Sequence, residues 1–446
     1  MGSPAATASP AVAELPRKLN LLDTALLLVG AVIGSGIFVV PSLIARRIAE
    51  PGLVIAIWVF SGLLVLCGAL TFAELGAMLP RSGGLYVYIR EAYGPFWGFL
   101  YGWTNFLVVI SAPIAALTAA FLLYLEYFFP LALWLEKLTG IAIILLLAGV
   151  NCLGVQWGAR VQNLFTFLKV AGLVGLVGAA LLLRNGHSAH FLPLWPQHFS
   201  GSLGPAIGVA MISTLFAYDG WHFVGFAAGE IRNPERNVPY GILLGVLIVI
   251  AVYVSANVAY IYVLGQPGIA ASSRVAADAM TAMIGPLGAT LITLAILCST
   301  FGAINANVLA GPRIFFAMAR DRVFPRWLAQ IHPRYETPAH AIWAVSLWAA
   351  VLTLTGGYEH LITMAMFAAW ILFAMAVASV IVLRRKHPEW PRPYRLLGYP
   401  WTAMVFVLVA VAFVINTLVE SPRSSLLGLG LVLAGVPMYL RWRPSR

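Results

Sequence analysis

Charged residues are scarce in this sequence. Aspartate, glutamate, lysine and arginine make up 10% of its 446 residues, whereas a soluble domain carries about 25%. Hydrophobic residues make up 61%. Such a chain has too little charge to cover a surface in water and too much apolar side chain to stay unfolded. The composition therefore excludes a soluble enzyme and a disordered chain, and it predicts an all-α integral membrane protein.

Cysteine is also rare. Cys67, Cys152 and Cys298 each lie within an apolar run, which is typical of small buried side chains and does not indicate a disulfide framework. The eight histidines do not cluster as metal ligands. The chain lacks a Walker motif, a nucleophile elbow and a His-Glu metal motif. We therefore expect no metal, no cofactor and no enzymatic activity.

Apolar runs dominate what is present. One bilayer crossing takes about 20 apolar residues, and the sequence offers twelve candidate spans. They lie near residues 21–47, 52–79, 95–128, 139–156, 158–183, 203–231, 239–264, 284–312, 338–356, 360–384, 399–419 and 424–442. Residues 1–16, rich in alanine, proline and serine, are predicted to be a disordered tail, followed by a single transmembrane domain over 17–443.

Basic residues predict the sidedness of these spans. With the N-terminus inside, 20 of the 27 lysines and arginines fall on the inner side, 6 on the outer side, and Lys169 lies within a span. The positive-inside rule therefore predicts that both termini are cytoplasmic. It also accounts for the net charge of +11 without a nucleic-acid partner.

Two spans are interrupted at mid-depth. Residues 28–38 read Leu-Val-Gly-Ala-Val-Ile-Gly-Ser-Gly-Ile-Phe, and residues 213–221 read Ser-Thr-Leu-Phe-Ala-Tyr-Asp-Gly-Trp. Glycines in the first run could simply allow close helix packing. However, the breaks fall in spans one and six, five helices apart, and a five-helix unit repeats in inverted orientation. Paired breaks in corresponding positions of two halves indicate a transporter binding site.

Unwound backbone supplies the chemistry of such a site. A half-helix starting near Ser35 offers free N–H groups and a positive dipole end, which suit a carboxylate. A half-helix ending near Phe216 and Ala217 leaves free carbonyls, which suit an ammonium group. Together they predict a site for the zwitterionic part of an amino acid.

Several motifs resemble one known family. They are Gly-Ser-Gly-Ile-Phe at 34–38, Phe-Ala-Tyr-Asp-Gly-Trp at 216–221, Glu-Ile-Arg-Asn-Pro-Glu-Arg-Asn-Val-Pro at 230–239, Arg-Ile-Phe-Phe-Ala-Met-Ala-Arg-Asp at 313–321 and Pro-Arg-Pro-Tyr at 391–394. The chain is similar over nearly its whole length to the amino acid–polyamine–organocation superfamily, and within it to the L-type amino acid transporters. The resemblance implies alternating access and a LeuT-like fold of five plus five inverted helices, with repeats near 21–183 and 203–384 and two additional helices near 399–442.

The resemblance also implies the site residues. The substrate carboxylate would meet the backbone of Ser35 and Gly36, and the ammonium would meet carbonyls near Val32, Phe216 and Asp219. Phe216 would gate the outer side, Trp221 would pack beside the cavity, and Trp370 in span ten would face the substrate. The expected substrate-binding set is Val32, Ser35, Gly36, Ile37, Phe216, Ala217, Asp219 and Trp370.

Lys169 lies within span five, where a charge is costly. Its side chain could reach the cytoplasmic edge. Sodium-independent relatives, however, place a lysine where sodium-coupled ones bind the cation. The resemblance thus implies that Lys169 joins a carbonyl of Gly30 or Ala31 to Ser299 or Thr300. This predicts sodium-independent transport, and proton coupling stays open.

Acidic residues and a histidine complete the candidates. Asp219 could shape the site through hydrogen bonds or pair with a cationic substrate. Glu74 and Glu230 could pair with loop arginines as an inner gate or could be solvated helix-end charges. His222 could line the cavity or be a satisfied interior residue.

These features predict a sodium-independent transporter, exchanger or uniporter, of neutral L-amino acids. The alternatives are a cationic amino acid or polyamine exchanger that uses Asp219, and a proton-coupled symporter. Animal L-type relatives pair with a glycoprotein through a cysteine between spans three and four, and here residues 129–138 contain no cysteine. We therefore expect no disulfide-linked heavy chain and a location in a bacterial inner membrane.

Overall fold

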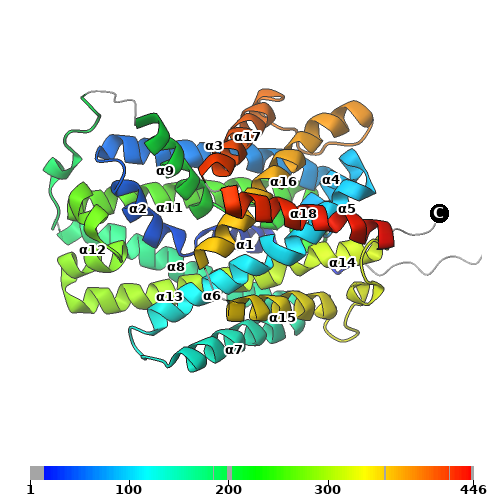
Figure 1. Ribbon diagram of the computed structural model, residues 1–446, viewed down its shortest axis with the longest axis horizontal. Helices are drawn as coiled ribbons and strands as arrows, with labels where there is room; N and C mark the ends of the chain where they lie inside the picture. The colour runs from blue at the N-terminus through cyan, green and yellow to red at the C-terminus, as the bar shows by residue number, and fades with distance from the viewer. Residues whose placement is uncertain (1–14, 184, 198–202, 356–357, 421, 443–446) are drawn as a thin grey trace, which may run out of the picture.

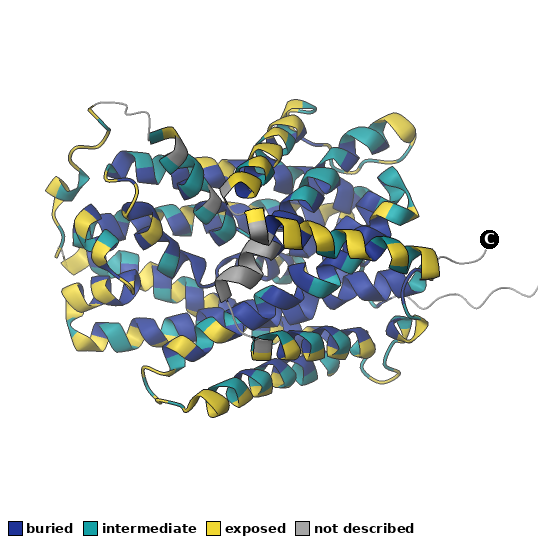
Figure 2. Cartoon of the chain, viewed as in Figure 1, coloured by how far each residue is buried: buried dark blue, intermediate teal, exposed yellow. Residues whose placement is uncertain are grey.

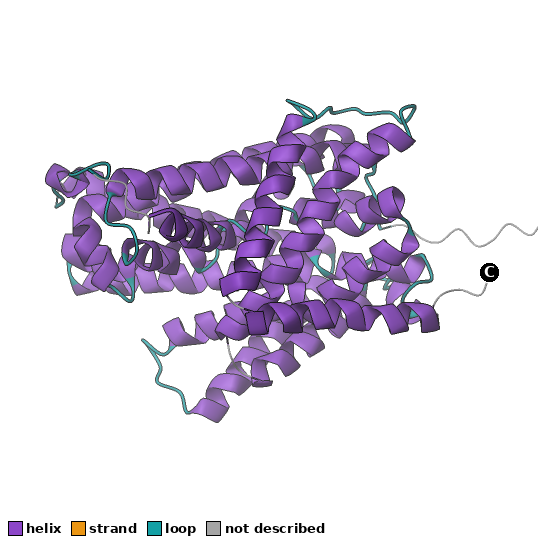
Figure 3. Cartoon of the chain, turned by 45° about the horizontal axis from the view of Figure 1, so that its top comes forward, coloured by secondary structure: helices purple, strands orange, loops and turns teal. Residues whose placement is uncertain are grey.

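A computed structural model describes residues 15–183, 185–197, 203–355, 358–420 and 422–442. Helices account for most of these residues (Figure 3). Within the described ranges there is no strand beyond one isolated bridge, between Leu19 and Ile231. The predicted all-α class is therefore confirmed. Of the predicted N-terminal tail, residues 1–14 lie outside the described ranges, and Leu15 is buried against the core.

Residues 15–183 form nine helical segments (Figure 1). They are α1 (Leu21–Val32), α2 (Gly36–Ala45), α3 (Pro51–Met78), α4 (Leu85–Tyr93), α5 (Pro95–Thr104), the π-helix η1 (Asn105–Val109), α6 (Ser111–Leu125), α7 (Leu133–Cys152) and α8 (Val155–Leu183).

The second half begins with a short 3₁₀ turn, η2 (Ser188–Phe191), and continues to the C-terminal helices. Its further elements are α9 (Leu203–Ala217), α10 (Phe223–Phe226), η3 (Ala228–Glu230), α11 (Pro234–Ala271), α12 (Val275–Ile284), α13 (Pro286–Ala310), α14 (Pro312–Arg320), η4 (Arg326–Ala329), α15 (Ala339–Thr355), α16 (Tyr358–Lys386), α17 (Trp401–Glu420) and α18 (Pro422–Trp442).

Every predicted span corresponds to helix. Among the described residues, eight helices are long and apolar enough to cross a membrane, and the bent pair α1–α2 makes a ninth. Spans six, nine and twelve correspond to the shorter apolar stretches Ala206–Ala217, Ala339–Leu354 and Ser425–Arg441.

Helices α4 and α12 lie outside the predicted spans. Helix α4 follows the second span of the first half, and α12 follows the second span of the second half. They lie toward opposite ends of the long axis of the molecule (Figure 1). An inverted pair of five-helix units would place equivalent elements in this way.

Local signals explain where helices begin. Helix α1 starts with a capping box, in which the Asn20 side chain accepts from the Asp23 N–H and the Asp23 carboxylate accepts from the Asn20 N–H, each at 3.0 Å. Proline occupies the first turn of α3, α5, α11, α13 and α14, where its missing N–H costs no hydrogen bond.

Helix α1 lies at the centre of the bundle. It packs against α11, α8 and α13, and buried residues fill the interior while exposed ones follow the outer faces of α17 and α18 (Figure 2). Many of the exposed side chains are large and apolar, such as Leu182 at 83% and Val419 at 71%. An apolar shell of this kind fits a lipid surface.

The chain before α1 is tied to the loop before α11. The backbone N–H groups of Lys18 and Leu19 donate to the carbonyl of Glu230, at 2.8 and 2.9 Å, and the N–H of Arg232 donates to the carbonyl of Leu19 at 2.8 Å. These bonds fix residues 18–19 against η3.

Candidate functional site

The first predicted break is present in the structure. Helix α1 ends at Val32, α2 begins at Gly36, and the two are bent by 42°. A Cβ atom on Gly36 would lie 2.8 Å from the Cα of Ala217, closer than packed atoms approach. Glycine at this position therefore allows α2 to touch the end of α9.

The second predicted break is also present. Helix α9 ends at Ala217 and α10 begins at Phe223. Gly220 has φ +105°, a conformation that glycine adopts without strain, and a Cβ there would lie 2.9 Å from the carbonyl group of Ala31. Each break thus packs closely against the other.

A cavity of about 70 Å³ lies where the breaks meet. Six of the predicted residues line it, namely Val32, Ser35, Gly36, Phe216, Ala217 and Asp219. The unbroken helices contribute residues that were not predicted, among them Pro113 and Leu117 of α6, Asn307 of α13 and Met366 of α16. Nothing in the sequence distinguished these positions from other helix-face residues.

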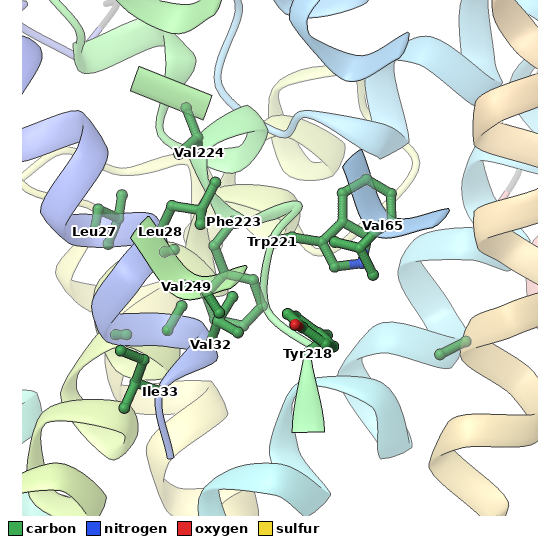
Figure 4. Packing of buried hydrophobic residues seen from close by; sticks show 14 of the residues in the cluster. Leu27, Leu28, Val32, Ile33, Val65, Tyr218, Trp221, Phe223, Val224 and Val249 are labelled. Carbon is green, nitrogen blue, oxygen red and sulfur yellow. The ribbon is translucent and has the colours of Figure 1, made fainter. Parts of the chain in front are cut away.

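Three other predicted residues lie outside the described lining of this cavity. Ile37 is fully buried in α2. Trp221 stacks on Phe72 with ring centroids 4.8 Å apart, and Figure 4 shows its indole beside Val65, across from the α1 side chains. The interpretation that Trp370 faces the substrate requires correction. Its ring stacks on Phe413 at 4.7 Å, because α17 packs against that face of α16.

Tyr253 of α11 joins the two breaks and was missed from the sequence. Its hydroxyl lies 3.0 Å from the carbonyl oxygen of Val32 and 3.0 Å from that of Ala217. These are the last residues of α1 and α9, whose carbonyls have no intrahelical donor. In the sequence, the hydroxyl of Tyr253 in the middle of an apolar span is the signal that could have indicated this role.

Lys169 of α8 reaches the first break. Its ammonium nitrogen lies 2.9 Å from the carbonyl oxygen of Gly30 and 2.6 Å from that of Ile33. The Ser299 hydroxyl donates toward the carbonyls of Ile33 and Gly34, at 3.2 and 3.3 Å. Thr300 instead bonds carbonyls of its own helix, at Ile296 and Leu297. Lys169 and Ser299 therefore meet on the same carbonyl, and Thr300 is not part of this cluster.

Asp219 borders the cavity, with 23% of its side chain exposed. Its backbone N–H donates to the carbonyl of Phe216 at 3.1 Å. The Nδ1 atom of His222 lies 3.8 Å from one carboxylate oxygen. His222 itself is buried and lies outside the described lining of the cavity.

Ion pairs close one end of the molecule. Glu230 and Arg313 form a two-bond pair, at 2.6 and 3.1 Å, with both side chains fully buried. Asp321 pairs with Arg90 and accepts from the Tyr86 hydroxyl at 2.6 Å. Burial and then the Asp321 charge raise the pKa of Tyr86, so that its hydroxyl remains a donor.

Glu74 belongs to the same end. Its carboxylate accepts from Arg384 at 2.9 and 2.6 Å and from the backbone N–H of Leu396 at 2.6 Å. These contacts join α3 to the end of α16 and the segment before α17, so Glu74 is fully buried.

A wide hollow occupies the opposite end. It has a volume of about 830 Å³ and is lined by residues that include Glu126, Glu136 and Arg274. Ser35 lines both this hollow and the central cavity. The two breaks are therefore approached from the end that carries α12, while the other end is held shut by ion pairs.

Comparison with known proteins identifies the family. The sequence model of the family described as "Amino acid permease" matches residues 19–435. The chain belongs to the amino acid permease family. This permease is a multi-pass membrane protein and an amino acid transporter, as its motifs predicted.

Several curated relatives cover nearly the full chain. The permease is 32% identical to the serine/threonine exchanger SteT of Bacillus subtilis over 95% of this chain and 96% of that protein. It is 32% identical to the human large neutral amino acids transporter small subunit 2, over 98% of this chain and 82% of that protein. It is 31% identical to the human b(0,+)-type amino acid transporter 1, over 96% of this chain and 88% of that protein.

Proposed function

We propose that this permease is a sodium-independent exchanger of small neutral L-amino acids that works by alternating access. The observation that carries the proposal is the meeting of two broken helices at one small cavity, beside a lysine ammonium group. The names of the relatives, two of them exchangers or transporters of neutral amino acids, support the same substrate class.

The backbone of the breaks suits the part that all amino acids share. Helix α2 begins at Gly36 without a side-chain cap, so its first N–H groups and its positive dipole end can receive a carboxylate. The carbonyls of Val32 and Ala217 face the Tyr253 hydroxyl, and each oxygen retains a second lone pair for an ammonium group. Phe216 borders the cavity and would cover the bound substrate.

The size of the cavity limits the side chain. The cavity has a volume of about 70 Å³. This is enough for roughly five or six water molecules. Among the amino acids, alanine, serine and threonine come closest to this size. This favours small neutral amino acids over arginine and polyamines.

Sodium independence rests on Lys169. A buried ammonium bonded to carbonyls of Gly30 and Ile33, with Ser299 on the second of these, occupies the cluster in which a bound cation would otherwise bridge α1, α8 and α13. Fixed charge at this point removes the need for a sodium ion to hold the break.

We further propose the arrangement in the membrane. Both termini would be cytoplasmic in a bacterial inner membrane, as the bias of basic residues predicts. The hollow beside Arg274 then opens outward and the Glu230–Arg313 pair closes the cytoplasmic side. The two five-helix repeats span about 21–183 and 203–384 within one domain over 17–443, and the protein works without enzymatic activity and without a disulfide-linked heavy chain.

Counterflow in proteoliposomes tests the function. Vesicles loaded with unlabelled L-serine should accumulate labelled L-serine from outside at the same rate in sodium and in choline buffer. Empty vesicles should accumulate far less. A requirement for sodium, or strong uptake of arginine with none of serine, would contradict the proposal.

A further inference from the structure

His222 is a buried basic side chain, and its imidazole makes no hydrogen bond to the described residues. Only 1% of the side chain is exposed, and the rings of Phe223, Phe226 and Phe373 surround it at 4.6 to 5.2 Å between centroids. Within the part of the chain that the structure describes, neither ring nitrogen has a hydrogen-bond partner. A polar group buried in this way is costly and calls for a reason.

The nearest charged group is Asp219. Nδ1 of His222 lies 3.8 Å from Oδ1 of Asp219, and among the described residues His222 is the only basic side chain within ion-pair distance of this carboxylate. Lys169 is held at the carbonyls of Gly30 and Ile33. The Tyr101 hydroxyl of α5 is a further titratable group near Asp219.

Asp219 therefore has two neighbours. Its carboxylate lies 3.8 Å from the imidazole of His222, and the residue also lines the cavity that Ser35 and Phe216 line. A carboxylate alone in this low-dielectric setting would attract a cationic group strongly. A carboxylate and a neighbouring imidazole that hold one proton between them carry no net charge, whichever of the two groups bears the proton.

We propose that His222 is a specificity-determining residue of the permease. It pairs with Asp219 so that the pair holds one proton and no net charge, and the cavity then accepts substrates with neutral side chains. Removing the imidazole frees the carboxylate for a cationic side chain of similar size. This inference rests on the proposed function, because it assigns charge selectivity to the same cavity.

Two substrates of equal size show the effect of side-chain charge on uptake without a difference in size. L-Homoserine and L-2,4-diaminobutyrate have the same number of non-hydrogen atoms and differ in a terminal hydroxyl or ammonium group. In proteoliposomes, the unchanged protein should prefer homoserine. His222→Asn should shift the ratio of initial uptake rates toward diaminobutyrate by about tenfold or more, as expected for an unpaired buried charge. His222→Asn combined with Asp219→Asn should lose that gain.

The ratio of the two initial uptake rates distinguishes a change in substrate selectivity from a loss of folded protein. A purely structural role for His222 would lower both rates together and leave the ratio unchanged, which would overturn the inference. His187→Asn, on an exposed histidine of the loop before α9, should match the unchanged protein. If His222→Asn does not fold, His222→Phe keeps an aromatic ring among its neighbours and should give the same shift. Uptake of neither substrate by the unchanged protein would instead reject the proposed function.

Discussion

The ammonium nitrogen of Lys169 lies 2.6 Å from the carbonyl oxygen of Ile33, the first residue beyond the end of α1. A residue of α8 thereby satisfies backbone that the break leaves without an intrahelical partner. The ammonium group thus connects α8 to the end of α1 beside the cavity.

Replacing this lysine tests that connection. We expect Lys169→Met to reduce serine counterflow at least tenfold, because two carbonyls lose a charged donor, a loss of about 1 to 3 kcal/mol. The melting temperature should fall by only a few degrees, since methionine fills similar space. Lys137→Met, near the start of α7, is the control and should transport normally. Full activity of Lys169→Met would contradict the assigned role.

Tyr253→Phe removes only a hydroxyl that joins Val32 and Ala217. We expect the apparent affinity for serine to weaken about tenfold, because the two half-helices lose their shared donor and the site becomes less well organised. Tyr260→Phe is a matched control two helical turns further along α11, because the buried Tyr260 hydroxyl has no partner among the described residues. Equal KM values for the two variants would argue against the bridge.

Alanine substitutions at Gly34 and Gly36, which belong to the same motif, should differ in their effect on stability. Gly36→Ala places a Cβ at 2.8 Å from Ala217, whereas Gly34→Ala finds its nearest atom at 3.5 Å, which is ordinary contact. We expect Gly36→Ala to separate α2 from α9 and to lower the melting temperature by several degrees with loss of transport. Gly34→Ala should keep the fold. A stable Gly36→Ala protein would show that the helices can adjust.

Glu230→Gln should destabilise the protein strongly. It leaves Arg313 buried without its counter-charge, and breaking one partner of such a pair costs about 3 to 5 kcal/mol. Glu235→Gln, which changes an exposed glutamate in the first turn of α11, controls for the loss of one negative charge at the same end of the molecule. Melting curves in detergent distinguish the two, and a Glu230→Gln curve that overlays the Glu235→Gln curve would rule out a structural contribution from the pair.

The sequence allowed prediction of the spans and the breaks because their signals are local. Apolar runs of membrane-spanning length and glycine-rich interruptions act on the residues that carry them. The helices α4 and α12 were missed because they are 9 and 10 residues long, too short to be recognised as spans. The lining of the cavity by the breaks followed from the same local signals.

The rotation of an unbroken helix about its own axis decides which of its residues face the site, and the local sequence does not determine it. Tyr253, Asn307 and Met366 reach the site from α11, α13 and α16 because of how those helices pack. Asn307 and Met366 belong to long apolar runs without a distinguishing pattern, and the hydroxyl of Tyr253 does not by itself show which way its helix is turned. Trp370 faces α17 for the same reason. Which side of an apolar helix faces inward depends on the neighbours that cover it, and these were not known from the sequence.

The hydrogen bonds from Lys18 and Leu19 to Glu230 place the amino-terminal segment across the same buried acid that pairs with Arg313. In the proposed orientation, release of substrate toward the cytoplasm has to disturb three parts at once: the segment at residues 18–19, the turn after α10 and the helix α14. Residues 18–19 must either move together with that turn or separate from it. A label attached at residue 18 would then report each transport cycle as a change in its distance from α14.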